Sequence, residues 1–271
     1  MVNRAAPPGS MRYFSVLYAP AEKRDAVLAL YVVDAEIRES AQSANHDVAH
    51  TRLEWWRAEV DRLVNGAPRH PAMRVLDAVA RDRRTDLMQL HELIAAADMD
   101  LARMTYANVN ELRAYCARSG GTIVELIASQ LVAPEMLNES ERLFARRVGV
   151  GVRQVEMVRD LRQDAYDGRL YLPLDEMDAR TITTAHVREA EGDARVRDAL
   201  RSWRARIQDD LQPRREMNDA RLRPLHVLAA LHRRLLDRIA ARNYDVGAER
   251  IELGPVEKPW IAWRAARRTG G

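Results

Sequence analysis

The chain of 271 residues has one cysteine, two phenylalanines, and no apolar run long enough to cross a membrane. A single Cys116 excludes an internal disulfide and a zinc site built on cysteines. Because no run approaches 18 apolar residues, we expect no transmembrane helix. The first residues, MVNRAAPPGSMRYF, lack the apolar segment of a secretory signal. Together these absences indicate a cytoplasmic protein.

The chain also lacks a large excess of charge of one sign. The chain has 43 Lys and Arg against 40 Asp and Glu, a net charge of +3. Such a balance does not favour nucleic-acid binding, so we expect no nucleic-acid partner. The seven histidines show no HExxH or HxH spacing, and we expect them at the surface or in loops.

The residues that are abundant favour helices. Ala, Leu, Arg, Glu and Asp dominate, and we find neither a convincing strand nor a repeat of 20 to 50 residues. Apolar residues at helical spacing predict helices over 19–42, 46–66, 71–82, 84–104 (with Thr85 as N-cap), 108–132, 139–166, about 186–211 and 221–242. We therefore predict an all-α, single-domain helical bundle over residues 11–250. It follows a loose, proline-rich lead-in (1–10) and precedes a basic, Trp-containing tail (251–271).

Gly120 and Gly121 lie inside the predicted helix 108–132. Each glycine costs a helix roughly 1 kcal/mol relative to alanine. A cost of this size indicates close packing, a kink, or room for a ligand. The sequence leaves these three open.

Three acids recur every four residues near the stretch VRDLRQDAYDGRLYLP: Glu156, Asp160 and Asp164. On a helix this spacing places them on one face, where like charges repel. One interpretation is a solvated face neutralised by nearby arginines. The other is a magnesium site, since Mg²⁺ prefers carboxylates and bridges them to phosphates. Such a site would help an allylic diphosphate to ionise, with the apolar bundle holding its hydrocarbon tail away from water.

The same stretch resembles the second aspartate-rich motif of the squalene/phytoene synthases, the head-to-head trans-prenyltransferases. That motif reads roughly N-x-x-R-D-x-x-x-D-x-x-x-G-R-x-Y-L-P. The matching residues are Arg159, Asp160, Asp164, Gly168, Arg169, Tyr171, Leu172 and Pro173. Other segments extend the likeness over residues 11 to about 250.

The resemblance implies an isoprenoid-synthase helical bundle acting on farnesyl or geranylgeranyl diphosphate in isoprenoid biosynthesis. It implies that Asp160, Asp164 and Glu156 are catalytic residues and ligands of Mg²⁺. It also implies NADPH as a cofactor where the product is squalene. The residues it places at the substrate are Arg38, Glu39, Arg153, Arg159, Arg169, Tyr171 and Tyr115.

The chain departs from the family pattern at the first acidic motif, D-D-x-x-D. Alignment of ALYVV places that motif on residues 38–42, RESAQ, where only Glu39 can bind a cation. In the second motif Glu156 replaces the usual Asn, and Arg153 replaces a nearby Gln. Two consequences remain open. The site would hold fewer magnesium ions and ionise a diphosphate slowly, or Arg38 and Arg153 would contact the diphosphate directly.

A branch of the superfamily has lost the first motif in this manner. It includes an assembly factor of mitochondrial complex I, with the pattern A-x-x-x-N-A-E-I-A…R-L-x-W-W. The stretch 29–57 is similar to it, with Asp34 where Asn is usual. The alternative function is therefore a non-catalytic assembly factor or scaffold, for example for a respiratory complex, with a protein partner.

The tail EKPWIAWRAARR combines Trp260 and Trp263 with basic residues. This combination is typical of a peripheral contact with a membrane, here the inner membrane. The alternative is a short helix that docks its tryptophans on the bundle.

Overall fold

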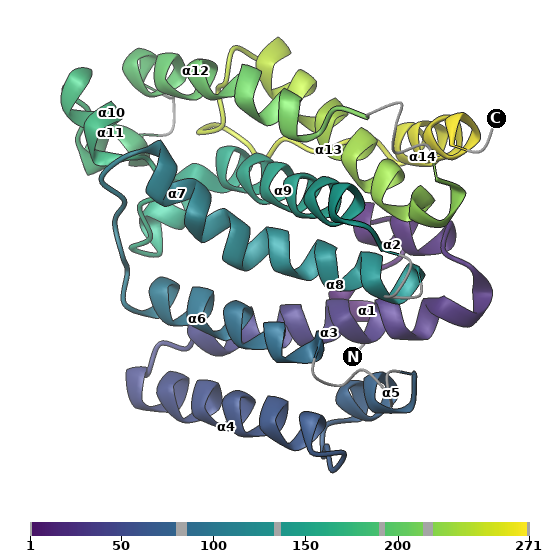
Figure 1. Cartoon of the computed structure of the whole chain (residues 1–271). Helices are drawn as coiled ribbons and strands as arrows, with labels where there is room; N and C mark the ends of the chain where they lie inside the picture. Colours follow the sequence, from purple (N-terminus) through teal and green to yellow (C-terminus); the bar gives the residue numbers. More distant parts are fainter. Residues whose placement is uncertain (1, 80–85, 133–136, 190–192, 214–218, 270–271) are drawn as a thin grey trace.

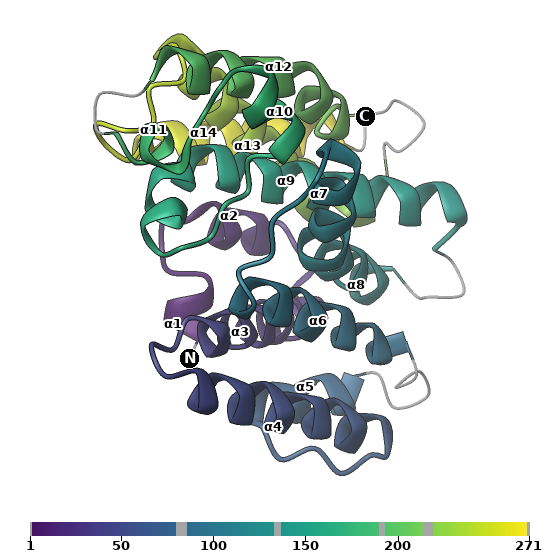
Figure 2. The same ribbon diagram turned by 90° about the vertical axis from the view of Figure 1, so that its left-hand side faces the viewer.

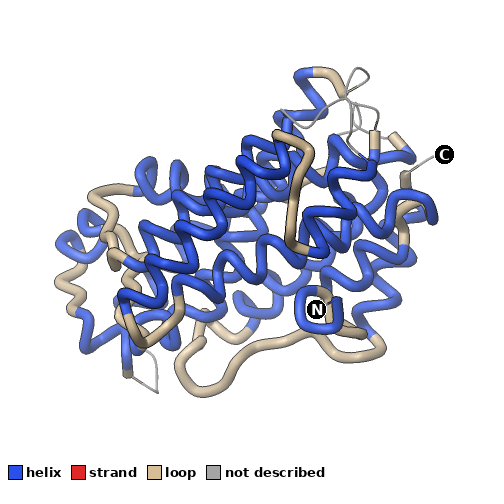
Figure 3. Tube along the Cα trace, turned by 90° about the horizontal axis from the view of Figure 1, so that it is seen from below, coloured by secondary structure: helices blue, strands red, loops and turns tan. Residues whose placement is uncertain are grey.

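The computed structural model describes residues 2–79, 86–132, 137–189, 193–213 and 219–269. Every regular element in these ranges is helical (Figure 3), which confirms the predicted all-α bundle. The longer elements are α2 (Met11–Leu17), α3 (Arg24–Ala41), α4 (His46–Val64), α5 (Pro71–Val79), α6 (Leu90–Leu101), α7 (Val109–Cys116), α8 (Thr122–Leu131), α9 (Glu139–Tyr166), α12 (Ala194–Asp210), α13 (Arg223–Ala241) and α14 (Glu257–Arg268). The shorter ones are α1 (Val2–Ala5), η1 (Ala21–Lys23), η3 (Ala117–Gly121), α10 (Leu174–Ala179), α11 (Thr184–Arg188) and η6 (Ala220–Leu222).

Local capping explains where several helices begin. The side chains of Asn45, Asn108 and Asn138 accept backbone N–H groups at the starts of α4, α7 and α9. At α9 Glu141 returns the bond, which completes a capping box. The predicted spans 139–166 and 221–242 correspond to α9 and α13. The predicted N-cap at residue 85 lies outside the described residues.

One predicted helix is wrong in extent. The span 186–211 covers the end of α11 and all of α12, and Asp193 starts α12 by accepting the N–H of Arg195. The aspartate favours a cap over helix continuation because its short side chain competes for nearby backbone groups.

The helices form stacked layers (Figures 1 and 2). In one half, α3 packs against α4, α5 and α6. In the other half, α9 packs against α12 and α13, and α13 carries α2 and α14. Helix α8 connects the halves by packing against both α3 and α9, and η3 does so by packing against α6 and α9.

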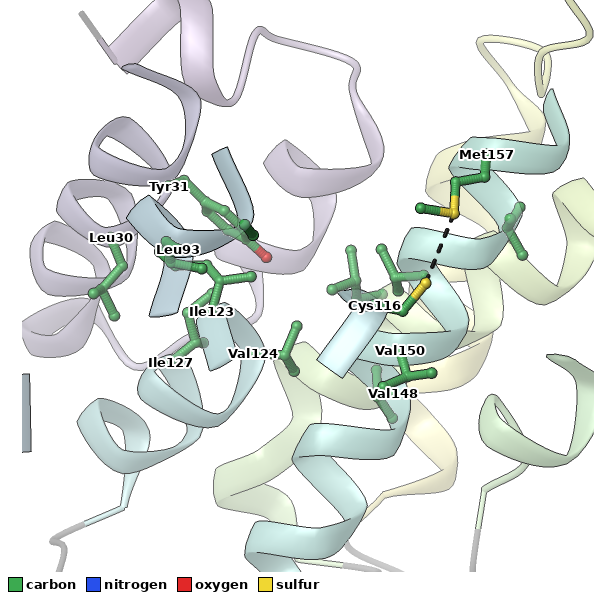
Figure 4. Packing of buried hydrophobic residues seen from close by; sticks show 14 of the residues in the cluster. Leu30, Tyr31, Leu93, Cys116, Ile123, Val124, Ile127, Val148, Val150 and Met157 are labelled. Atoms are coloured by element: carbon green, nitrogen blue, oxygen red, sulfur yellow. Dashed lines mark hydrogen bonds between the residues drawn. The ribbon is translucent and has the colours of Figure 1, made fainter. Parts of the chain in front are cut away.

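A continuous apolar core runs through both halves, and Figure 4 shows part of it. Leu30 from α3 and Ile123 from α8 are buried there with Val148 from α9. Cys116 is fully buried, with its sulfur 3.7 Å from that of Met157. Burial raises the pKa of this thiol to about 12. The cysteine is therefore a packing residue.

The two central glycines serve close packing. They end a π-helical segment, η3, that lies against α9. A Cβ atom on Gly120 would lie 2.2 Å from the carbonyl oxygen of Gly149, and one on Gly149 would lie 2.1 Å from that of Gly120. Only glycines allow two backbones to approach this closely.

Other parts of the chain differ from expectation. The lead-in 1–10 contains α1, and Ala5 is buried against the bundle. The surface placement of the histidines is wrong for His70, His226 and His232, which are buried. Each of these rings contacts neighbouring groups in the folded chain, an environment that histidine spacing does not reveal.

The C-terminal helix α14 docks through small residues. Ala262 and Ala266 are buried against the bundle, whereas the Trp260 and Trp263 side chains are 56% and 42% exposed. The two indole rings stack at 5.1 Å. The helix therefore docks on the bundle, as the alternative has it, but its alanines are buried there and both tryptophans stay partly exposed. None of the helices in the described part of the chain is long and apolar enough to span a membrane.

Candidate functional site

The three acids Glu156, Asp160 and Asp164 lie on the C-terminal half of α9, and each of them has arginine side chains close by. Both oxygens of Asp160 accept hydrogen bonds from Arg159 and from Arg250, whose Nε lies 2.8 Å from Oδ1. Burial would raise the pKa of this carboxyl, but the bonds from Arg159 and Arg250 lower it. Asp160 is thus ionised and its oxygens are already engaged.

Asp164 lies one helical turn further on. Its Oδ1 accepts from Nη2 of Arg169 at 3.0 Å, and Arg169 also contacts Asp167 at 2.9 Å. Burial raises the pKa of Asp164 in spite of its arginine neighbours. Asp160 and Asp164 therefore have different electrostatic environments, although both belong to the same motif.

Glu156 is paired more loosely. Its Oε2 lies 3.7 Å from Nη1 of Arg153 and 3.9 Å from Nη1 of Arg38, beyond hydrogen-bond distance. Burial alone would raise its pKa, but the surrounding arginines, led by Arg38, lower it to about 2. The Glu156 carboxylate is therefore charged at every ordinary pH.

Helix α3 lies opposite Glu156 and contributes Asp34 and Arg38 to the site. Asp34 is 1% exposed and accepts from Arg12 at 2.8 Å and from Nε of Arg38 at 2.9 Å. These bonds direct the Arg38 guanidinium towards Glu156 on α9. Arg38 is thus a cation held between two acids, Asp34 and Glu156.

A second network holds Arg153. Its Nη2 donates to the hydroxyls of Tyr115 at 2.9 Å and Tyr171 at 3.1 Å. Burial raises the pKa of both phenols, that of Tyr115 to about 12, so both stay protonated. Each phenol donates to Asp100, at 2.8 Å from Tyr115 and 2.7 Å from Tyr171. Asp100 thereby orients the phenol lone pairs that receive Arg153.

A hollow of about 410 Å³ opens beside Glu156. Its charged lining includes Arg12, Arg159, Arg250 and Lys258 against Glu156 and Glu252. His232 also lines it, and burial lowers the pKa of that ring to about 4, so the ring is neutral near pH 7. A pocket of this size with guanidinium groups on its wall suits a phosphate-bearing ligand.

The structure brings most of the predicted site residues together. Arg38, Arg153 and Glu156 form one cluster with Tyr115 and Tyr171. The ion-paired residues Arg159 and Asp160 lie next to it, and the pair Asp164 and Arg169 follows one turn later.

Glu39 lies apart from this cluster. Its carboxylate pairs with Arg4 at 3.2 Å and lines a different hollow, with Trp55 and His70. Successive residues on a helix differ in direction by about 100°, so Arg38 and Glu39 cannot face the same partner.

Sequence reasoning missed three residues of the site, Arg12, His232 and Arg250. Asp34 and Asp100 also belong to it, although the sequence did not assign either of them a role there. Asp34 had a local signal, since it lies four residues before Arg38 on one helix face. Arg250 had none, because it contacts Asp160 across 90 positions of sequence.

The acids do not fit a cage for several magnesium ions. In the part of the chain that the structure describes, no three His, Cys, Asp or Glu side chains are grouped to hold a metal. The oxygens of Asp160 and Asp34 already accept arginine donors, so a metal would compete for them. Magnesium and NADPH stay predictions, as does the cytoplasmic location.

The solved structures that this chain resembles share its fold. A dehydrosqualene synthase crystallised with a ligand matches with a TM-score of 0.82 at 15% identity, over 94% of this chain and 90% of its own. The squalene synthase HpnC from Alicyclobacillus acidocaldarius matches with a TM-score of 0.77 at 19% identity, over 90% of this chain and 93% of its own.

Sequence comparison adds relatives in the same group. The chain is 26% identical to the chloroplastic phytoene synthase of Cucumis melo, over 91% of this chain and 60% of that protein. It is 27% identical to the phytoene synthase of Arthrospira platensis, over 88% of this chain and 82% of that protein. The chain thus spans about 60% of the length of the Cucumis melo relative. The family model for squalene/phytoene synthase matches residues 6–257, and the chain therefore belongs to the squalene/phytoene synthase family.

Proposed function

We propose that the chain binds a prenyl diphosphate, of the farnesyl or geranylgeranyl class, in the arginine-lined hollow beside α9. The supporting observation is that Arg12, Arg159 and Arg250 line one hollow while Arg38 and Arg153 converge on its Glu156 wall. Guanidinium groups bind phosphate oxygens in a bidentate manner, which fixes orientation as well as charge. The named relatives of this chain, phytoene and squalene synthases, point to the same substrate class.

Turnover, in this proposal, is head-to-head prenyl transfer. Arginines held in advance around the diphosphate would stabilise the negative charge that develops on the leaving group. The Asp100–tyrosine network would keep Arg153 in place during that step. Magnesium at Asp160 and Asp164 would have to replace arginine contacts that both acids already make. We therefore derive no step through the metal.

A second candidate function is a binding protein without turnover, such as an assembly factor or scaffold. The observation that favours it is the cation at position 38. Arg38, held by Asp34, occupies the α3 wall where the family pattern has acids. A site of this kind holds a diphosphate but is poorly equipped to assemble metal ions around it.

Titration of the full chain with farnesyl and geranylgeranyl diphosphate tests binding. Arg159→Gln should weaken the affinity about tenfold or more, because it removes a guanidinium from the hollow. The matched control is Arg242→Gln, whose exposed side chain pairs with Glu249 away from the site. Absence of binding by the unmodified chain would refute the proposal.

Pyrophosphate release with Mg²⁺ and NADPH then separates the two functions. Release that Asp160→Asn abolishes supports the enzyme. If no pyrophosphate is released from a prenyl diphosphate of any chain length, while binding is intact, the non-catalytic function is supported.

We also propose that α14 contacts a membrane surface from one side. Trp260 and Trp263 are exposed on the helix face that carries Arg264 and Arg267, and anionic lipids attract such a face. Co-sedimentation with vesicles rich in phosphatidylglycerol should fall when both tryptophans are replaced by alanine. Leu143→Ala, at an exposed apolar position elsewhere, is the control. Equal sedimentation of all three proteins would contradict the proposal.

A further inference from the structure

The Glu156 carboxylate differs from the other acids of the site in how it meets its arginines. Asp34 and Asp160 each accept close hydrogen bonds from two guanidiniums. Glu156 has its two arginine contacts at 3.7 and 3.9 Å. It is therefore held among cations by charge and not by fixed hydrogen bonds.

Its surroundings are already built by other groups. Asp34 holds Arg38 from behind, and the two phenols hold Arg153. Neither arginine depends on Glu156 for its position. The carboxylate is 18% exposed and lines the hollow together with Arg12. Arg12, Arg159 and Arg250 line the hollow, and Arg38 and Arg153 lie beside Glu156 at its wall. Removal of the Glu156 charge would therefore leave this set of cations intact.

A diphosphate that reaches these arginines must come close to Glu156. Two negative groups would then share one set of cations, and their repulsion weakens the binding of the mobile one. A magnesium ion between them would reverse this sign, since it would attach the carboxylate to the phosphate. The sign of the Glu156 effect on binding therefore distinguishes the two arrangements.

We propose that Glu156 is a built-in counter-anion that occupies the arginine cluster until a diphosphate displaces it, with no bridging metal. This inference rests on the proposed function of the same site. It assigns Glu156 the role of a competitor that lowers the affinity of the site for diphosphate, in place of the metal-ligand role that the sequence predicts. Arg38 and Arg153 become the groups that the diphosphate takes over.

Calorimetric titration of the full chain with inorganic pyrophosphate tests this, once with EDTA and once with Mg²⁺. Glu156→Gln keeps the shape of the side chain and removes its charge. We expect it to bind pyrophosphate about tenfold more tightly than the unmodified chain under both conditions. Glu54→Gln, at an exposed acid of α4 paired with Arg57, should leave the affinity unchanged.

The contrary outcomes are distinct. Weaker binding by Glu156→Gln, or binding by the unmodified chain only with Mg²⁺, overturns the counter-anion and leaves the proposed function standing. No binding by any variant under either condition overturns both. Circular dichroism checks the fold of each variant, and Glu156→Asn gives the same test with a smaller neutral side chain if Glu156→Gln does not fold.

Discussion

The two halves of α9 show two kinds of constraint on one helix. Around Gly149 and Gly151 the helix backbone lies directly against its neighbours, and a Cβ on Gly151 would lie 2.8 Å from Leu211. From Glu156 onwards the helix carries acids, each placed among arginines. Steric fit therefore governs the first half, where the site is anchored to the fold. Charge governs the second half, where a ligand can replace internal partners.

The largest expected effect comes from the first half. Gly149→Ala should lower the free energy of unfolding by about 3 kcal/mol or more, because the new methyl group meets backbone that cannot rotate away. Urea denaturation measures it. Gly254→Ala is the control, since its Cβ would meet nothing closer than 4.0 Å. A loss below about 1 kcal/mol would mean that α9 and η3 can separate without harm.

The second half should respond to charge and to pH. The pKa of Glu156 is lowered from 4.5 to about 2, so its ionisation stabilises the fold above pH 4.5, and this contribution is lost as pH falls towards 2. Glu156→Gln should therefore lower the free energy of unfolding by about 2 to 3 kcal/mol at pH 7. The difference from the unmodified chain should narrow below about pH 4.5. A difference that does not change between pH 7 and pH 3 would contradict this.

The same substitution should thus act in opposite directions on two properties. Glu156→Gln weakens the fold and, as proposed above, strengthens pyrophosphate binding. No substitution at Gly149 should separate stability from binding in this way. The Glu156 carboxylate would therefore stabilise the fold and, at the same time, lower the affinity of the site for diphosphate.

The sequence predicted the steric constraint in the first half of α9 only in outline. The span of α9 and its acid stripe follow from a local period of 3.6 residues, which any helix obeys. The glycine pair predicted close packing as one of three outcomes, because the partner backbone at Gly149 is distant in sequence. The π-helical form of η3 has no local signal in the sequence.

The partners of the acids in the second half of α9 were harder to predict from the sequence. Family resemblance identified Arg38, Arg153 and Glu156, yet it also suggested Glu39, which faces Arg4. The rotation of a helix within the bundle decides which of its residues face the site, and the local sequence does not determine that rotation. Arg250 reaches Asp160 from a segment 90 residues away.

A smaller effect is expected at Asp100, which supports the charged half indirectly. Asp100→Asn removes a carboxylate that accepts from both phenols, and should cost about 1 to 2 kcal/mol of stability. Because Arg153 loses its oriented acceptors, pyrophosphate affinity should fall a few-fold as well. The control is Asp98→Asn, on the same helix α6, where Asp98 pairs with Arg57 of α4. It should lower stability by less than about 1 kcal/mol and leave affinity unchanged. Equal affinity of both variants would remove Asp100 as a positioning residue.

The smallest effect is expected at Gly121, next to the close backbone contact between Gly120 and Gly149. A Cβ there would lie 3.0 Å from Cγ of Arg146, a flexible side chain, and 3.4 Å from its carbonyl oxygen. The arginine can move aside, and alanine gains roughly 1 kcal/mol over glycine within a helix. Gly121→Ala should therefore change the free energy of unfolding by less than about 1 kcal/mol, measured by urea denaturation beside Gly149→Ala. If both variants lose equal stability, the steric constraint extends over the whole glycine pair. If only Gly149→Ala does, the constraint between α9 and η3 is a single crossing of two backbones at Gly149 and Gly120.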